Sequence, residues 1–166
     1  NTNVLGIRWH YPVNFEEASL RYYFKRFDGS PWKRGVGFVS EIVPKPLVAS
    51  LVNLFFNEHY STAKMGHRIL ETADNLFVGY SWKKRNQHQN VIQVNATPQL
   101  QDIAAGSEAE FIFEHYFGYN QFTSNKTIEY AVSHPRWQIY PVKNFSIDCD
   151  IEQLYGKAFI PFIQNK

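Results

Sequence analysis

The pattern of apolar and polar positions changes from strand-like to helix-like within residues 35–60. Residues 35–43 form a short, apolar, β-branched run, which is typical of a buried strand. Pro44 and Pro46 then end any strand ladder because neither can donate an N–H, and Pro46 suits the first turn of a helix. The pattern therefore predicts a strand followed by a helix over residues 47–60.

The predicted helix is apolar around most of its circumference. Its polar residues form a single line at spacings of three and four, made by Ser50, Asn53 and Asn57. A helix of this kind must be largely enclosed. Lys45 would lie beside its positive end, where the macrodipole and desolvation both lower the pKa of an ammonium group. The sequence thus makes Lys45 its one candidate for chemistry.

Residues 18–27 form a second predicted strand, and its two sides differ in polarity. One side carries Ala18, Leu20 and Tyr22, and the other carries Glu17, Ser19, Arg21 and Tyr23. Two interpretations are open. The polar side faces water, as in an ordinary antiparallel strand, or it faces the inside of a barrel, where Glu17 and Arg21 reach into a pocket.

The rest of the chain alternates strand patterns with turn signals. Further strands are predicted over residues 4–9, 62–71, 76–83, 91–97, 119–122, 127–132, 138–142 and 145–150. Helices are predicted over residues 107–117, where Ser107 and Glu110 form a capping box and Gly118 stands at the stop, and over residues 151–155. This order predicts a single α+β domain over residues 1–166 with a mostly antiparallel sheet.

Composition narrows the function classes. The chain has 166 residues with 44 % hydrophobic and 19 % charged content, and its net charge of +2 is too small to imply a nucleic-acid or membrane partner. A single cysteine, Cys149, excludes an internal disulfide, and the neighbouring Asp148 and Asp150 raise its thiol pKa. No run approaches the ~20 apolar residues of a membrane span, so a cytoplasmic protein is expected.

The common catalytic and metal-binding motifs are absent from the sequence. There is no His-Glu-x-x-His, Cys-x-x-Cys, Gly-rich phosphate loop or Gly-x-Ser-x-Gly, and the six histidines lack ligand spacing. We therefore expect no metal and no cofactor. The basic stretch at residues 83–90 is typical of a solvated turn. Single-stranded nucleic-acid binding is its alternative interpretation.

Six segments of the chain occur in the order seen in a known bacterial family. They are Asn14-Phe15-Glu16-Glu17-Ala18-Ser19-Leu20-Arg21, Arg34-Gly35-Val36-Gly37-Phe38, Glu41-Ile42-Val43-Pro44-Lys45-Pro46, Glu58-His59-Tyr60, His115-Tyr116-Phe117-Gly118-Tyr119 and His134-Pro135-Arg136-Trp137. On these the whole chain resembles the DUF2071 (YqjF-like) proteins, which are grouped with acetoacetate decarboxylase. The resemblance implies a strongly curved, cone-like, largely antiparallel β-barrel with helices at its ends and an enclosed cavity.

The resemblance also bears on single residues. Residues 41–46 look like a shortened form of the decarboxylase segment Glu-x-x-x-Pro-Lys-Lys, which carries the Schiff-base lysine. Lys45 then aligns with the first of the two lysines and Pro46 with the second. The neighbouring lysine, which lowers the pKa of the Schiff-base lysine in the decarboxylase, is therefore missing here. A carboxylate of the decarboxylase pocket would fall near Glu17. Family members carry several dozen residues before the segment that Asn1 resembles, and those residues are expected to supply further strands. Without them the sheet has an open edge that something must cover, and a homo-oligomer is among the partners considered.

These observations favour a small-molecule-binding protein with an enclosed pocket, whose ligand lies against Tyr23, Phe38, Tyr80 and Trp82. The alternative is a Schiff-base decarboxylase or related lyase. There Lys45 would attack a small keto acid, Glu17 or Glu41 would move protons, and Arg21 would hold an anionic group in a cavity also lined by Ser19. We further expect Lys45 to point away from the cavity or to pair with a carboxylate such as Glu41.

Overall fold

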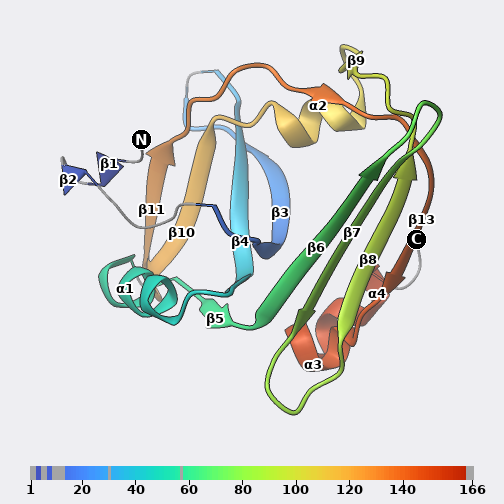
Figure 1. The fold of residues 1–166 in the computed structure, drawn as a ribbon. Helices are drawn as coiled ribbons and strands as arrows, with labels where there is room; N and C mark the ends of the chain where they lie inside the picture. The colour runs from blue at the N-terminus through green and yellow to red at the C-terminus, as the bar shows by residue number, and fades with distance from the viewer. Residues whose placement is uncertain (1–2, 5–6, 9–13, 30, 57, 164–166) are drawn as a thin grey trace.

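Two β-sheets dominate the computed structural model, which describes residues 3–4, 7–8, 14–29, 31–56 and 58–163 (Figure 1). The five-stranded sheet contains β3 (Ala18–Arg26), β4 (Lys33–Val43), β5 (Tyr60–Thr62), β10 (Phe117–Thr123) and β11 (Lys126–Ala131). The four-stranded sheet contains β6 (Lys64–Glu71), β7 (Leu76–Lys83), β8 (Asn90–Ala96) and β13 (Val142–Asp148). Two short pairs add β1 (Asn3–Val4) with β2 (Ile7–Arg8), and β9 (Gln101–Asp102) with β12 (Gln138–Ile139).

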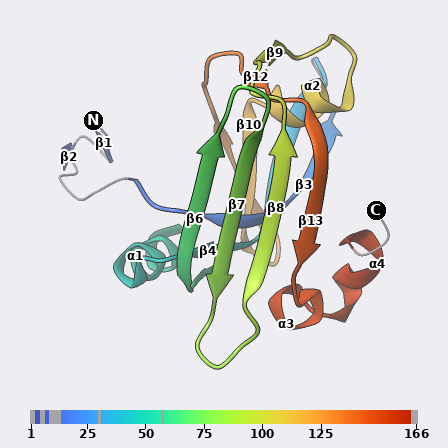
Figure 2. The same cartoon turned by 45° about the vertical axis from the view of Figure 1, so that its right-hand side comes forward.

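The helices are short and lie at the ends of the sheets. They are α1 (Pro46–Phe56), α2 (Glu108–Phe113), α3 (Ile151–Tyr155), the 3-10 turn η1 (Lys157–Phe159) and α4 (Ile160–Ile163). Figure 2 shows the four-stranded sheet in front of the five-stranded one, with α3 and α4 beside its lower end. None of the helices in the described part of the chain combines the length and hydropathy that a bilayer crossing needs.

Strand β4 is the centre of the five-stranded sheet. It pairs antiparallel with β3 and parallel with both β10 and β5, and β11 extends the sheet beyond β10. Two glycines allow rings to lie flat on this sheet. A Cβ at Gly37 would stand 2.2 Å from the ring of Tyr22, and one at Gly118 would stand 2.2 Å from the ring of Tyr130. These close approaches require the absence of a side chain.

The buried core joins the two sheets. Ile42 of β4, Trp82 of β7 and Leu154 of α3 pack together with Ala63, which lies between β5 and β6. Ile42 is fully buried and Trp82 is 4 % exposed. Burial of such side chains is the main source of folding free energy, each contributing about 1.5–3 kcal/mol, so this cluster holds the sheets in their relative positions.

The predicted mostly antiparallel α+β architecture is confirmed, but the cone-like closed barrel is not found. The two main sheets end at β3 and β11, and at β6 and β13, in the part of the chain that the structure describes. The chain passes from one sheet to the other at Ala63. Thr62, the first residue of the strand predicted over residues 62–71, pairs in β5 with β4, whereas residues 64–71 form β6, which pairs with β7.

The helix predicted after β4 is present, but the described residues do not enclose it. Ala49 is buried, whereas Leu47, Leu54 and Phe55 are 55 %, 76 % and 66 % exposed. Apolar residues around a whole helix exceed what one neighbouring strand can cover, and α1 packs mainly against β5.

Three predicted boundaries also differ from the structure. Helix α1 ends before Tyr60, because the Asn53 side chain bonds both the N–H and the C=O of that residue at 2.8 Å and holds it in β5. Helix α2 ends at Phe113, so Gly118 lies inside β10 rather than at a helix stop. Of the strand predicted over residues 4–9, residues 5, 6 and 9 lie outside the described residues, and the other three are divided between β1 and β2, which pair antiparallel with each other.

Candidate functional site

Glu41 is a buried carboxyl group at the centre of the five-stranded sheet. Its residue is 4 % exposed, and it lies directly opposite Tyr60 in the parallel pairing of β4 with β5. The Tyr60 hydroxyl donates to Glu41 Oε1 at 2.9 Å. Asn53 of α1 fixes the Tyr60 backbone, so helix, strand and carboxyl group form one unit.

Four further ionisable side chains act on this pair. Arg21 of β3 donates from Nη2 to Glu17 Oε1 at 3.1 Å and from Nε to Ser19 Oγ at 2.9 Å. Ser19 lies opposite Glu41 in the β3–β4 pairing. Glu58, just before β5, and Tyr130 of β11 complete the group, which we call the Glu41 cluster: Glu17, Arg21, Glu41, Glu58, Tyr60 and Tyr130.

The electrostatics of the Glu41 cluster oppose the ionisation of Glu41 and Glu58. The pKa of Glu41 is raised to about 7. Desolvation is the largest cause and the negative charges of Glu58 and Glu17 add to it, while the Tyr60 hydrogen bond and Arg21 act in the opposite direction. Burial likewise raises the pKa of Glu58, with a contribution from Glu17. Burial also raises the pKa of Tyr130 to about 12. At neutral pH Glu41 is therefore close to half-protonated, which suits proton exchange or hydrogen bonding in either direction.

The structure brings together some of the residues predicted for a site. Glu17, Ser19, Arg21 and Glu41 lie in or beside the Glu41 cluster, and the Arg21 guanidinium lies 5.0 Å from the centroid of the Phe38 ring. The side chains of Glu17 and Arg21 are about one-third exposed, at 32 % and 34 %. The two side chains form an ion pair, so the charge of the Arg21 guanidinium is already compensated by Glu17.

The four predicted aromatic contacts do not lie together. Tyr23 of β3 packs against His115, with ring centroids 5.4 Å apart. Tyr80 and Trp82 belong to β7 in the other sheet, where Tyr80 is 40 % exposed and Trp82 is part of the core. The predicted wall of Tyr23, Phe38, Tyr80 and Trp82 is thus divided between the two sheets.

Lys45 lies half-buried between β4 and α1, and its carbonyl accepts the first helical bond, from Ala49 N. Within the described ranges no ion pair forms between Lys45 and Glu41, whose partner is Tyr60. The positive charge of Lys45 instead acts on Glu16. The pKa of Glu16 is lowered chiefly by its hydrogen bond with His67 and to a lesser extent by Lys45.

Two adjoining cavities lie beside the four-stranded sheet. The larger, of about 650 Å³, is lined by Pro44, Pro46, Thr62, Ala63, Lys64, Met65, Lys83, Lys84, Arg85 and Asn86. The smaller, of about 300 Å³, shares Lys64, Met65 and Lys83 with it and adds Trp82 to its wall. Trp82 is the one predicted contact residue that lines either cavity.

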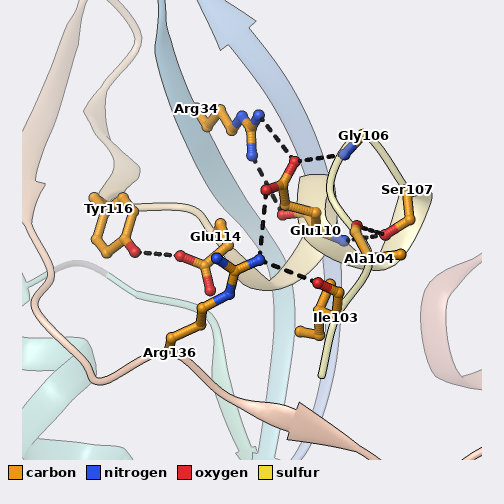
Figure 3. A network of polar contacts seen from close by, with 9 residues as sticks. All are labelled: Arg34, Ile103, Ala104, Gly106, Ser107, Glu110, Glu114, Tyr116 and Arg136. Carbon is orange, nitrogen blue, oxygen red and sulfur yellow. Dashed lines mark hydrogen bonds and ion pairs between the residues drawn. The ribbon is translucent and has the colours of Figure 1, made fainter. Parts of the chain in front are cut away.

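A second polar group, around Glu110, joins segments that are distant in sequence (Figure 3). The Glu110 carboxylate of α2 accepts from Gly106 N at 3.0 Å and lies 3.6 Å from Arg34 and 3.8 Å from Arg136. The Gly106 hydrogen bond and the two arginines lower the pKa of Glu110. Ser107 caps α2 by accepting from Glu110 N, as the capping box predicts. This network ties α2 to β4 and to the chain before β12.

The same group explains why scattered segments of the sequence belong together. Arg34, Tyr116 and Arg136 come from three of the segments on which the family resemblance rests, and Figure 3 shows them around α2. The DUF2071 family model, described as an uncharacterized conserved protein, matches residues 1–164. The chain belongs to the DUF2071 family. No curated protein and no solved structure matches it.

Membership of DUF2071 does not by itself assign a reaction, so the residues must be judged individually. Sequence reasoning missed Glu58, Tyr60 and Tyr130 as members of the Glu41 cluster. Glu58 and Tyr60 stood inside a DUF2071-like segment, which was a usable signal, whereas Tyr130 reaches the cluster through the parallel pairing of β10 with β4. The raised thiol pKa predicted for Cys149 is found in the structure. Burial is the main cause of its raised thiol pKa, and Asp148 adds to it.

Proposed function

We propose that the protein binds a small organic molecule at the Glu41 cluster. The observation that carries this proposal is a carboxyl group, 4 % exposed, whose pKa of about 7 arises from burial and from two acidic neighbours. A carboxyl group of this kind lowers stability, because its charged form is poorly solvated and no cation bonds it in the described part of the chain. Strongly perturbed acids of this kind occur most often at functional sites.

The charges of the cluster favour one class of ligand. The cluster holds three carboxyl groups and one guanidinium, and that guanidinium already donates to Glu17 and Ser19. A protonated amine would hold Glu41 in its charged form and compensate the cluster, whereas a carboxylate would add to the repulsion. The ligand we infer therefore carries an ammonium group or another strong hydrogen-bond donor, with an apolar part near Phe38.

The test is a titration of the protein with benzylamine and putrescine, followed through the backbone amide signals. Saturable shifts at Glu41, Tyr60 and Tyr130 are expected, and they should be lost in Glu41→Gln. Glu129→Gln is the matched control, because Glu129 also accepts a tyrosine hydroxyl but lies outside the cluster. Equal responses of Glu41→Gln and the wild type, or no saturation in either, would refute the proposal.

The second candidate is imine chemistry at Lys45, as in the decarboxylase grouping. It is favoured by one observation, the half-buried position of Lys45 with no ion pair among the described residues. An amine can form an imine only where it is partly unprotonated and can reach a keto compound. Borohydride trapping with small keto acids, read by intact mass on the wild type and Lys45→Ala, separates the two functions. An adduct confined to the wild type would replace amine binding by imine chemistry.

A further inference from the structure

The larger cavity is lined by four basic side chains and by no acidic one. Lys64, Lys83, Lys84 and Arg85 come from the paired strands β6 and β7 and from the turn that follows β7. We call this surface the basic groove. It uses none of the residues of the Glu41 cluster, so it stands independently of the function proposed above.

The cations of the basic groove have no anionic partner within the described ranges. None of the ion pairs there includes Lys64, Lys83, Lys84 or Arg85. Several cations elsewhere in the described ranges are paired with carboxylates. Lys33, for example, lies 2.7 Å from Asp28 and 2.9 Å from Glu129. The groove thus concentrates positive charge that the rest of the fold leaves uncompensated.

This arrangement also destabilises the fold locally. Lys64 and Lys83 are directly opposite each other in the β6–β7 pairing, and like charges at such positions destabilise a sheet. Lys84 is half-buried, and desolvation lowers its pKa, which indicates that its ammonium group lacks full hydration. A ligand that supplied negative charge would relieve both costs.

We propose that the basic groove binds a small phosphate-bearing organic molecule. A cavity of about 650 Å³ is within the range for small-ligand sites, roughly 300–1,000 Å³. Lysines and an arginine bind phosphate oxygens through charge-assisted hydrogen bonds, and the arginine can do so with two parallel bonds. Pro44, Pro46 and Met65 give the groove an apolar side for the organic part of the ligand.

The lining of the groove distinguishes this ligand from single-stranded nucleic acid. Binding of single strands uses aromatic rings on which successive bases stack. The larger cavity has no aromatic side chain in its lining, and Trp82 in the smaller one is 4 % exposed and packed into the core. The groove therefore has the charge for phosphate but not the stacking surface for bases.

The experiment uses inorganic pyrophosphate as the probe and backbone amide signals as the readout. Saturable shifts at Lys64 and at residues 83–86 are expected, with a Kd below about 1 mM that weakens as NaCl rises. Lys83→Glu should weaken binding by about tenfold or more. Lys157→Glu changes the net charge equally at a side chain that is 82 % exposed and outside the groove, and it should leave pyrophosphate binding unchanged.

A second readout guards against a trivial loss of folding. Because Lys83→Glu places a carboxylate opposite Lys64, it should raise Tm by roughly 1–3 °C while it weakens pyrophosphate binding. Pyrophosphate shifts that do not saturate, that spread over all surface cations, or that persist with undiminished affinity in Lys83→Glu would overturn the proposal. Tighter binding of an oligothymidylate, lost in the same variant, would replace it with nucleic-acid binding.

Discussion

Glu41 and Glu129 each accept a hydrogen bond from a tyrosine hydroxyl, but their carboxyl pKa values are shifted in opposite directions. Each lies directly opposite a tyrosine on a neighbouring strand and accepts its hydroxyl, at 2.9 Å from Tyr60 for Glu41 and at 2.6 Å from Tyr119 for Glu129. Burial raises the pKa of Glu41, whereas the Tyr119 hydrogen bond and the nearby Lys33 lower the pKa of Glu129.

The difference comes from the charges around each carboxyl group. Glu129 lies between Lys33 Nζ at 2.9 Å and Arg26 Nη1 at 3.4 Å, so its ionised form is compensated. Glu41 is surrounded by Glu17 and Glu58. A tyrosine–glutamate pair can therefore stabilise the fold on the surface and oppose it in the interior. The interior pair is the one that a ligand could improve.

The largest expected effect is a change in the pH dependence of stability in Glu41→Gln. Between pH 4.5 and about 7 the folded protein keeps a proton on Glu41 that the unfolded chain releases. Stability therefore falls as pH rises through this window, by about 3 kcal/mol at most, since one pKa unit corresponds to about 1.4 kcal/mol. Glu41→Gln should remove this fall and exceed the wild type in stability at pH 8.

Urea unfolding at pH 4.5, 6, 7 and 8 measures this effect, and Glu129→Gln is its control. The control should keep the wild-type slope between pH 6 and 8, because the lowered pKa of Glu129 places its own titration below that range. A wild-type protein whose stability does not fall over the window would show that Glu41 ionises normally.

The next effect is expected from removal of each tyrosine hydroxyl. Tyr60→Phe leaves the buried Glu41 carboxylate without its donor, which should cost about 1–3 kcal/mol at pH 8. It should also raise the pKa of Glu41, because the Tyr60 hydrogen bond lowers it. Tyr119→Phe leaves Glu129 paired with Lys33 and Arg26, so it should lower the free energy of unfolding by less. Urea unfolding of both variants measures the difference, and equal losses would remove the distinction between the two pairs.

A smaller effect is expected from the surface pair in acid. The pKa of Glu129 is lowered, so its contribution to stability is present above pH 4.5 and is lost as pH falls through its folded pKa. Glu129→Gln should therefore destabilise the protein at pH 7 and lose that difference at low pH, the opposite trend to Glu41→Gln. The two trends, measured in the same acid titration, must have opposite signs.

Much of the fold was predictable from local pattern. Alternation located β3, the β-branched run located β4, and Ser107 with Glu110 located the start of α2. Events that depend on distant residues were not predictable. The Asn53 side chain hydrogen-bonds the backbone of Tyr60 and holds that residue in β5 instead of the helix. Similarly, no local pattern shows that the chain passes from one sheet to the other at Ala63, because this change depends on whether β4 or β7 supplies the partner.

The candidate site was predictable in part for the same reason. Glu17, Ser19 and Arg21 share one side of a strand, so alternation placed them together. Glu41 was identified by its place in the family segment, but its raised pKa depends on burial and on Glu58, which no spacing reveals. Lys45 was singled out by its position before the predicted helix and by the family segment, but in the structure its charge acts on Glu16, outside the Glu41 cluster.

The finest test of the comparison separates the two halves of the Arg21–Glu17 ion pair. Glu17 raises the pKa of Glu41 and Arg21 lowers it, although the two side chains bond each other at 3.1 Å. Glu17→Gln should therefore lower the pKa of Glu41, and Arg21→Gln should raise it, each by less than the effect of burial. Carbon-13 titration of the glutamate side chains measures both shifts. If the ion pair mattered only as a structural unit, both substitutions would move the pKa in the same direction.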